Sequence, residues 1–292
     1  MKLVALMLLL AGTAHAQAKI RIICIGAHPD DCDIKAGGAA VKWAAAGHAV
    51  KFVAVTNGDA GHQKQGGKVL AARRRSEAGE SGRRAGIQYE VLNQEDGELT
   101  PSLEARRAVI RQIRLWRADL VLAPRSNDYH PDHRYTAVLV QDAAYLVTVP
   151  NLVPDAPALR QNPVFAYLAD PFQKPAAFRP DIVVAVDDVL DRKLDMLDAH
   201  ESQFYEWMPW HAGQLDQVPR DKTKRRTWLA AQWPRYATAF GLDPTLPPWR
   251  SSLSKRLGER AGAARNAEAF EIAEYGRQPE EAEIRRLFPF FP

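Results

Sequence analysis

Two short segments of the chain carry most of the side chains that could do chemistry. Residues 27–31 read Ala-His-Pro-Asp-Asp and place one imidazole and two adjacent carboxylates beside a proline. Proline fixes its own φ, so we expect a stiff turn. Because adjacent side chains point in different directions, one carboxylate could bind a metal ion while the other faces a water molecule on that ion. Taken alone, the segment also fits an ordinary turn with an aspartate helix cap.

The second segment lies far along the chain, where residues 127–134 read Asn-Asp-Tyr-His-Pro-Asp-His-Arg. His130 and His133 are three residues apart, so near the start of a helix they can face the same side. Histidine is the commonest metal ligand and the usual acid or base at neutral pH. Two surface histidines near a helix cap would be the alternative if this segment stood alone.

Together, the two segments supply the ligand count of a catalytic zinc site. His28, Asp31 and His133 offer two nitrogens and one carboxylate, which leaves a fourth position open for water. The metal would lower the pKa of that water and polarise a carbonyl group. The same ligand set also suits iron(II), so the choice between zinc and iron stays open.

Three further side chains of these segments could take part in the reaction. Asp30 remains as the general base that accepts a proton from the metal-bound water. His130 could stabilise the oxyanion or protonate the leaving amine. Asp132 could orient His130 by accepting a hydrogen bond from its ring.

The elements around the two segments indicate how they meet. Apolar runs alternate with helical patterns, which predicts parallel βαβ units, and ligands bind at the carboxyl ends of the strands in such sheets. Each segment follows a predicted strand. The predicted strands are 20–25, 49–55, 89–92, 119–123, 164–168 and 182–186, and the predicted helices are 36–46, 69–85, 102–116, 132–147 and 189–199.

The rest of the chain differs in texture. Residues 150–163 are rich in proline and predict a loop, and tryptophan, proline and arginine dominate from residue 203 onward. We predict that residues 207–292 form helices and loops packed on the sheet rather than an independent domain. Residues 17–292 are therefore expected to form one domain.

Residues 1–16 have the pattern of a secretory signal peptide. Lys2 precedes an apolar run over residues 3–11, and residues 14–16 read Ala-His-Ala, a typical cleavage signature. The apolar run is too short to span a bilayer comfortably, so we expect no stable membrane anchor after cleavage. We therefore predict cleavage after residue 16 and a periplasmic or secreted protein.

The composition is that of an ordinary globular protein. The chain has 292 residues, of which 46% are hydrophobic and 25% charged, and this excludes a collagen-like repeat, a coiled coil and a disordered chain. Its net charge of +4 is small for this length, and we expect no nucleic-acid partner. Two cysteines are too few for a disulfide scaffold, and we expect Cys24 and Cys32 to be unpaired thiols. The oligomeric state is left open.

The chain resembles the PIG-L/LmbE-like deacetylases over most of residues 20–203. The resemblance implies a Rossmann-like, mostly parallel sheet with helices on both faces. It also implies a zinc-dependent enzyme that hydrolyses amides, usually N-acetyl groups on amino sugars. It rests on AHPDD at 27–31, TNGDAG at 56–61, Arg74 with Glu77, Asp96 with Gly97, HPDHR at 130–134 and AHESQ at 199–203.

Carried over residue by residue, the resemblance implies the same roles as the residue chemistry. His28, Asp31 and His133 would be the metal ligands. Asp30 would be the base, and His130 would be the polarising imidazole with Asp132 as its partner. The resemblance further implies that Arg74 and Asp96 contact sugar hydroxyls. The chain departs from the family pattern at Cys32, where a glutamate usually follows the two aspartates, and this change removes no ligand.

We therefore expect an exported zinc-dependent hydrolase that removes N-acetyl groups through metal-bound water and an aspartate base. Its expected partner is a small N-acetylated amino sugar or a glycoconjugate. One alternative is an amidase that cleaves another amide bond, in a conjugate or a peptide. Another is a carbohydrate-binding protein without catalytic activity.

Overall fold

The computed structural model describes residues 19–291 of the chain. The predicted signal peptide at residues 1–16 lies outside the described residues. Within residues 19–291, no helix combines the length and the apolar character that crossing a bilayer requires.

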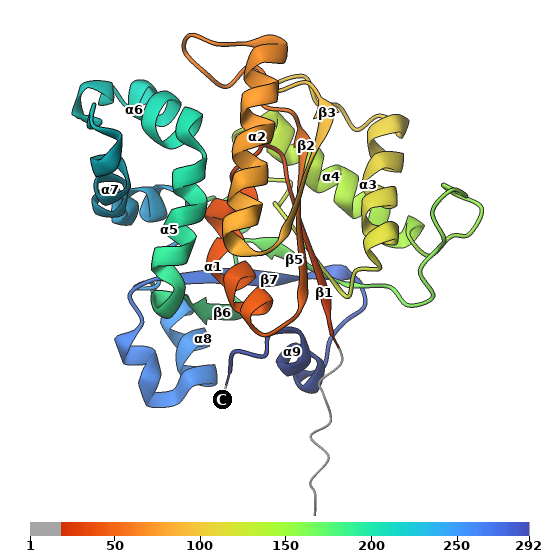
Figure 1. Cartoon of the computed structure of the whole chain (residues 1–292). Helices are drawn as coiled ribbons and strands as arrows, with labels where there is room; N and C mark the ends of the chain where they lie inside the picture. The colour runs from red at the N-terminus through yellow and green to blue at the C-terminus, as the bar shows by residue number, and fades with distance from the viewer. Residues whose placement is uncertain (1–18, 292) are drawn as a thin grey trace, which may run out of the picture.

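The described residues build one seven-stranded sheet with helices on both faces (Figure 1). The strand order is β3-β2-β1-β4-β5-β7-β6, and the five strands from β3 to β5 run parallel to one another. This confirms the predicted α/β fold with a mostly parallel sheet. The strands are β1 (Arg21–Gly26), β2 (Ala49–Thr56), β3 (Gln88–Gln94), β4 (Leu120–Ala123), β5 (Val164–Leu168), β6 (Ile182–Ala185) and β7 (Ala267–Gly276).

The first four helices connect parallel strands and cover both faces of the sheet, as crossover connections require. In the described part of the chain, the α-helices are α1 (Asp31–Ala45), α2 (Gly67–Ala85), α3 (Leu103–Trp116), α4 (Pro131–Leu146), α5 (Leu190–Ala199), α6 (Met208–His211), α7 (Arg225–Ala239), α8 (Pro247–Leu257) and α9 (Glu281–Leu287). Shorter helical turns are η1 (Asp187–Val189), η2 (Gln203–Trp207), η3 (Leu215–Gln217), η4 (Lys222–Lys224) and η5 (Gly258–Ala263).

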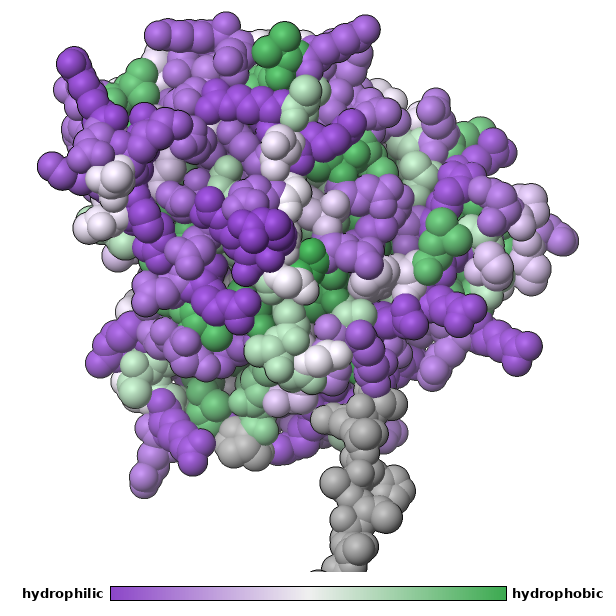
Figure 2. Space-filling view, in the orientation of Figure 1, coloured by the Kyte–Doolittle hydropathy of each residue, from purple (hydrophilic) through white to green (hydrophobic). Residues whose placement is uncertain are grey.

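Strand β1 shows how the sequence builds a core on each face of the sheet. Successive side chains of a strand point to opposite faces. Ile22 and Cys24 pack with α1 on one face, whereas Ile23 and Ile25 pack with α3 and α4 on the other. Only a strand covered on both sides buries such a continuous apolar run. The face of the molecule seen in Figure 2 is mostly hydrophilic, with smaller apolar patches.

The C-terminal part of the chain adds a third apolar core at the β6 side of the sheet. Leu229 and Trp233 of α7 and Leu253 of α8 pack with Leu194 and Leu197 of α5. Helix α7 therefore lies against α5, and α8 lies beside β6 (Figure 1).

One prediction for the C-terminal part is wrong. We predict helices and loops for residues 207–292, but β7 lies there and runs antiparallel between β5 and β6. Glu268 interrupts the apolar pattern of this strand, yet it is fully buried. Its carboxylate accepts hydrogen bonds from the amides of Gly38 and Ala39 and from Lys193 Nζ, each at 2.7 Å. Because these partners lie in α1 and α5, the local sequence does not reveal that this glutamate belongs to a buried strand.

Helix α1 begins at Asp31, earlier than the predicted residue 36. Asp31 and Asp33 occupy its first turn, where the helix dipole favours negative charge. The early start places Asp31 in the helix directly after the turn that carries His28, and its Oδ2 accepts hydrogen bonds from the amides of that turn.

Candidate active site

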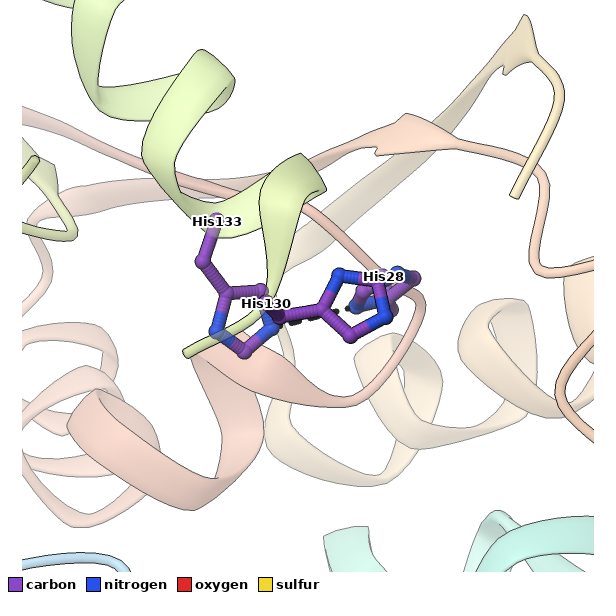
Figure 3. A group of neighbouring side chains, drawn as sticks. All are labelled: His28, His130 and His133. Atoms are coloured by element: carbon purple, nitrogen blue, oxygen red, sulfur yellow. Dashed lines mark hydrogen bonds between the residues drawn. The ribbon is translucent and has the colours of Figure 1, made fainter. Parts of the chain in front are cut away.

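The two predicted motifs meet at the carboxyl edge of the sheet. His28 follows β1, and His133 lies in the first turn of α4, which follows β4. Because β1 and β4 are parallel neighbours, their carboxyl ends lie at the same edge. Figure 3 shows the rings of His28, His130 and His133 gathered at this point.

The three predicted metal ligands lie within contact distance of one another. His28 Nδ1 is 3.2 Å from His133 Nε2 and 3.6 Å from Asp31 Oδ2. Asp31 Oδ1 is 3.4 Å from His133 Nε2. Ligand atoms about 2.0–2.1 Å from a tetrahedral zinc ion would be about 3.3 Å apart. The spacing therefore fits one small divalent cation, while metal binding itself stays a prediction.

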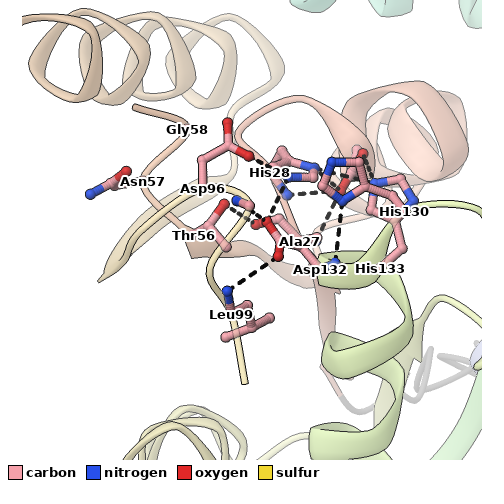
Figure 4. Close-up of polar contacts among 12 residues, drawn as sticks. Ala27, His28, Thr56, Asn57, Gly58, Asp96, Leu99, His130, Asp132 and His133 are labelled. Atoms are coloured by element: carbon pink, nitrogen blue, oxygen red, sulfur yellow. Dashed lines mark hydrogen bonds and ion pairs between the residues drawn. The ribbon is translucent and has the colours of Figure 1, made fainter. Parts of the chain in front are cut away.

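Carboxylates behind both imidazoles determine which ring nitrogen carries the proton. His28 Nε2 lies 3.2 Å from Asp132 Oδ2 and 3.1 Å from Asp96 Oδ1 (Figure 4). His133 Nδ1 lies 3.1 Å from Asp128 Oδ2. Protons on these nitrogens leave lone pairs on the two nitrogens that face each other. Two facing lone pairs repel unless a cation or a proton lies between them, so the donor set fits a metal ion.

The Asp31 carboxylate is oriented by the turn that precedes it. Its Oδ2 accepts hydrogen bonds from the amides of Ala27 and His28 at 2.9 and 2.8 Å, while Oδ1 faces His133. Burial alone would raise the pKa of Asp31, but His133 and His28 hold that pKa well below its usual range. Asp31 is therefore charged, as a ligand of a divalent cation should be.

Negative charge also dominates around His133. Burial lowers the pKa of His133, but Asp31 and Asp128 raise it to about 9. The carboxylates that favour a proton on this imidazole would equally favour a metal cation.

Asp30, the predicted general base, is buried next to the predicted ligands and paired with Arg74. Arg74 Nη2 donates to Asp30 Oδ1 at 3.2 Å and to the carbonyl oxygen of Pro29 at 3.3 Å. Burial raises the pKa of the Asp30 carboxyl to about 6, against the lowering effect of Arg74. A carboxyl group with a pKa near neutrality can both accept and return a proton near pH 7.

His130 caps the first turn of α4 and has one ring nitrogen left to donate. Its Nδ1 accepts a hydrogen bond from the amide of Asp132 at 3.2 Å, so the neutral ring carries its proton on Nε2. Burial and the positive charge of His28 lower the pKa of His130, which keeps its ring neutral at pH 7. The ring centroids of His130 and His28 are 4.7 Å apart. His130 therefore brings a hydrogen-bond donor to the site.

The predicted pairing of the Asp132 carboxylate with the His130 ring is wrong. The fully buried Asp132 carboxylate instead faces His28 Nε2 and accepts from the amides of Gly97 at 2.7 Å and Leu99 at 3.3 Å. Those amides belong to the turn after β3, and the hydrogen bond between Asp132 and His130 comes from the main-chain amide of Asp132. Asp132 thus orients a predicted ligand rather than the polarising imidazole.

The predicted contacts of Arg74 and Asp96 with sugar hydroxyls are not supported by their positions. Arg74 is only 2% exposed, and its Nη1 lies 3.7 Å from Asp96 Oδ2. Asp96 Oδ1 faces His28. Because both charged groups already have protein partners, they are placed to hold Asp30 and His28 from behind.

Sequence reasoning missed the positions of Asp128 and Lys35 beside the predicted ligands. Asp128 Oδ2 faces His133 Nδ1, and its place just before the histidine pair was the available signal. Lys35 lines a cavity beside Asp31 and His133 and donates to the carbonyl oxygen of Ala169 at 2.8 Å. A lysine within a helix gives no local sign of such a distant contact.

Cys32 lies in the first turn of α1 and points into the apolar core. Its Sγ faces the carbonyl oxygen of Val53 at 4.0 Å, and it packs in the same core as Cys24. Both cysteines are free thiols, as predicted. The residue that replaces the usual glutamate therefore belongs to the packing behind the site.

The protein has a mostly parallel α/β sheet with a cluster of histidines and carboxylates at its carboxyl edge. This combination places it among the α/β proteins that match the PIG-L deacetylases. Residues 23–144 match the PIG-L family, described as GlcNAc-PI de-N-acetylase. The chain is 32% identical over 203 residues to diacetylchitobiose deacetylase of Thermococcus kodakarensis, a match that covers 65% of this chain and 73% of that protein. The chain belongs to the PIG-L family.

Solved structures show the same fold. N,N'-diacetylchitobiose deacetylase from Pyrococcus horikoshii matches with a TM-score of 0.62 and 27% identity, over 86% of this chain and 83% of that one. The conserved protein TT1542 from Thermus thermophilus matches with a TM-score of 0.59 and 21% identity, over 89% and 97% of the two chains. The 4-carboxy-2-hydroxymuconate hydratase GalB from Pseudomonas putida matches with a TM-score of 0.62 and 17% identity, over 90% and 99%. The last two likenesses concern the fold alone.

Proposed function

We propose that this chain is a metal-dependent N-deacetylase that acts on an N-acetylated amino sugar or its conjugate. The observation that carries the proposal is the convergence of His28, Asp31 and His133, with the buried carboxyl group of Asp30 beside them. The family description and the names of two deacetylase relatives support the reaction and the class of substrate.

Zinc is the proposed metal, and iron(II) is the second candidate because the same ligand set suits both. His28 Nδ1, Asp31 Oδ1 and His133 Nε2 would hold the ion. When bound, a divalent metal supplies a Lewis acid for the amide carbonyl and makes water more acidic.

Asp30 is the proposed proton acceptor for the attacking water. Arg74 fixes its Oδ1 at 3.2 Å and thereby sets the direction of the carboxylate. Its raised pKa allows Asp30 to hold the proton and then to pass it to the amine that leaves.

His130 is the proposed donor to the oxygen that becomes negative during the attack. The amide of Asp132 occupies Nδ1, so the proton is kept on Nε2. A fixed donor next to a developing negative charge stabilises the transition state more than the substrate.

The test is acetate release from N,N'-diacetylchitobiose by the zinc-loaded protein, with the sugar product identified by mass. We expect acetate and a free amine, and a chelator should stop the reaction. Sugar binding without acetate release would instead favour a carbohydrate-binding protein. Cleavage of other amides, with no activity on N-acetyl sugars, would favour the amidase alternative.

Export is a further part of the proposal and rests on the signal-like pattern of residues 1–16. Cell fractionation should find the protein outside the cytoplasm, with its N-terminus at residue 17. Deletion of residues 2–16 should retain it in the cytoplasm, and equal fractionation of both forms would contradict export.

A further inference from the structure

Two loops at the carboxyl edge of the sheet line one side of the cavity beside the predicted metal ligands, and we call the mouth of this cavity the opening of the site. Residues 124–130 follow β4, and residues 169–181 follow β5. Because β4 and β5 are parallel neighbours, both loops leave the sheet at the edge where His133 lies. The cavity beside the predicted ligands is lined from both loops, by residues that include Pro124, Asp128 and Ala169.

Tyr129 lies on this side of the opening and is 74% exposed, the largest fraction among the exposed large hydrophobic side chains of residues 19–291. Its ring centroid is 5.9 Å from that of His133 and 5.8 Å from that of His130, with nearly perpendicular ring planes. Tyr129 belongs to none of the apolar cores of the described chain. Core packing therefore does not explain why an aromatic ring stands in water beside a predicted metal ligand.

The second loop brings another ring to the same place. The centroid of Phe172 is 6.4 Å from that of Tyr129, and this partly exposed ring is likewise outside the apolar cores. Two aromatic side chains from different loops thus form a small apolar surface beside an otherwise polar site.

A buried guanidinium holds the Phe172 loop in this position. Arg125 is 7% exposed and makes two hydrogen bonds to the Asp170 carboxylate, at 2.7 and 2.6 Å. It also donates to the carbonyl oxygens of Phe172 at 3.1 Å and Ala176 at 2.9 Å. Such a bidentate, buried ion pair fixes geometry as well as charge. The aromatic surface is therefore built on an ordered support.

A pyranose ring has the matching chemistry. Its axial C–H groups form an apolar face that packs on a flat aromatic ring, while its hydroxyl groups stay in water. The Tyr129 and His133 rings meet in an edge-to-face arrangement, so a sugar on Tyr129 would have its acetamido group next to the predicted metal ligands.

We infer that Tyr129, backed by Phe172, is the platform on which the sugar ring of the substrate stacks. The inference rests on the proposed deacetylase function and adds the residues that select a sugar. Tyr129 binds the sugar ring and takes no part in hydrolysis of the amide.

The test compares two substrates, N,N'-diacetylchitobiose and N-acetylethanolamine, which has the acetamide without a sugar ring. Tyr129→Ala should raise KM for the sugar about tenfold, which is the upper end of what one aromatic stacking contact contributes. It should leave kcat/KM for N-acetylethanolamine within about threefold, and Tyr129→Phe should behave like the parent because it keeps the ring. Tyr145→Ala is the matched control, since Tyr145 is 73% exposed at the far end of α4.

Two kinetic outcomes would overturn the inference. Equal losses on both substrates would assign Tyr129 to the chemistry, and no loss on either would leave it without a role in recognition. If the parent protein hydrolyses neither substrate, the proposed function fails, and saturation-transfer NMR with the same sugar then tests the platform alone. Loss of the sugar signal in Tyr129→Ala supports the platform, whereas an unchanged signal, or none in the parent, rejects it.

Discussion

At the residue scale, the site consists of the predicted metal ligands and, behind them, the groups that orient these ligands. His28, Asp31 and His133 face a common point, and each is oriented from behind by a carboxylate or by main-chain amides. Such outer partners set the tautomer and direction of the ligands and raise their basicity. Asp30 and His130 stand beside this point and carry the proposed proton transfers.

Asp30 and His133 should respond differently to substitution because one is a proposed base and the other a proposed ligand. We expect Asp30→Asn to keep its metal and to lose about 10²- to 10⁴-fold in kcat, the usual contribution of a general base. His133→Ala should lose both metal and activity. Metal analysis and acetate release on the same samples check this, and equal metal loss in the two variants would contradict the division of roles.

Asp128 should affect metal affinity without being a ligand. Its Oδ2 faces His133 Nδ1 at 3.1 Å, so Asp128→Asn removes the charge that orients this imidazole. We expect zinc affinity to fall about 10- to 100-fold, as for other outer partners of metal ligands. Zinc titration against a chelating indicator measures it. Asp142→Asn is the control. It also removes the charge of a carboxylate in an ion pair, here with Arg106, and it should bind zinc like the parent.

At the scale of elements, the turn between β1 and α1 and the N-terminus of α4 position the ligands, and β7 supports α1 from behind. Glu268 of β7 bonds to two amides of α1 and to Lys193 of α5. One buried carboxylate thus joins three elements that are distant in the sequence.

Removal of this carboxylate should destabilise the fold strongly. Glu268→Ala leaves the buried ammonium of Lys193 without its ion-pair partner, and breaking a buried pair in this way costs about 3–5 kcal/mol. Urea denaturation measures the change in the free energy of unfolding. The control Asp188→Ala breaks an ion pair to Lys42 in which Asp188 is 66% exposed, so we expect a loss of about 1 kcal/mol or less. Similar losses in the two variants would show that Glu268 does not join the elements as described.

At the scale of the whole molecule, the proposed metal would link the first βα unit to α4 across the sheet. An ion that binds only the folded protein stabilises it by mass action. We therefore expect zinc to raise Tm. When free zinc reaches 100 times its Kd, the free energy of unfolding should increase by about 2.7 kcal/mol. Thermal unfolding at several zinc concentrations checks this, with His133→Ala as the control. A zinc response that persists in that variant would place the ion elsewhere.

The position of the site could be predicted because its signals are local. The motifs that contain His28 and His133 directly follow apolar strands, and parallel strands end at one edge of a sheet. The alternation of strands and helices likewise indicated the α/β fold. Strand β7 could not be predicted in this way, because Glu268 breaks its pattern and its partners lie in other elements.

The residue types and their spacing by themselves determined a candidate set of two histidines and an aspartate with a second aspartate as base. Only the tertiary structure decided which carboxylate stands behind which imidazole. Asp132 pairs with His28 rather than His130, and Arg74 pairs with Asp30 rather than reaching the opening. The physical reason is that a buried charge pairs with the nearest group able to neutralise it, and that neighbour is set by how distant segments pack.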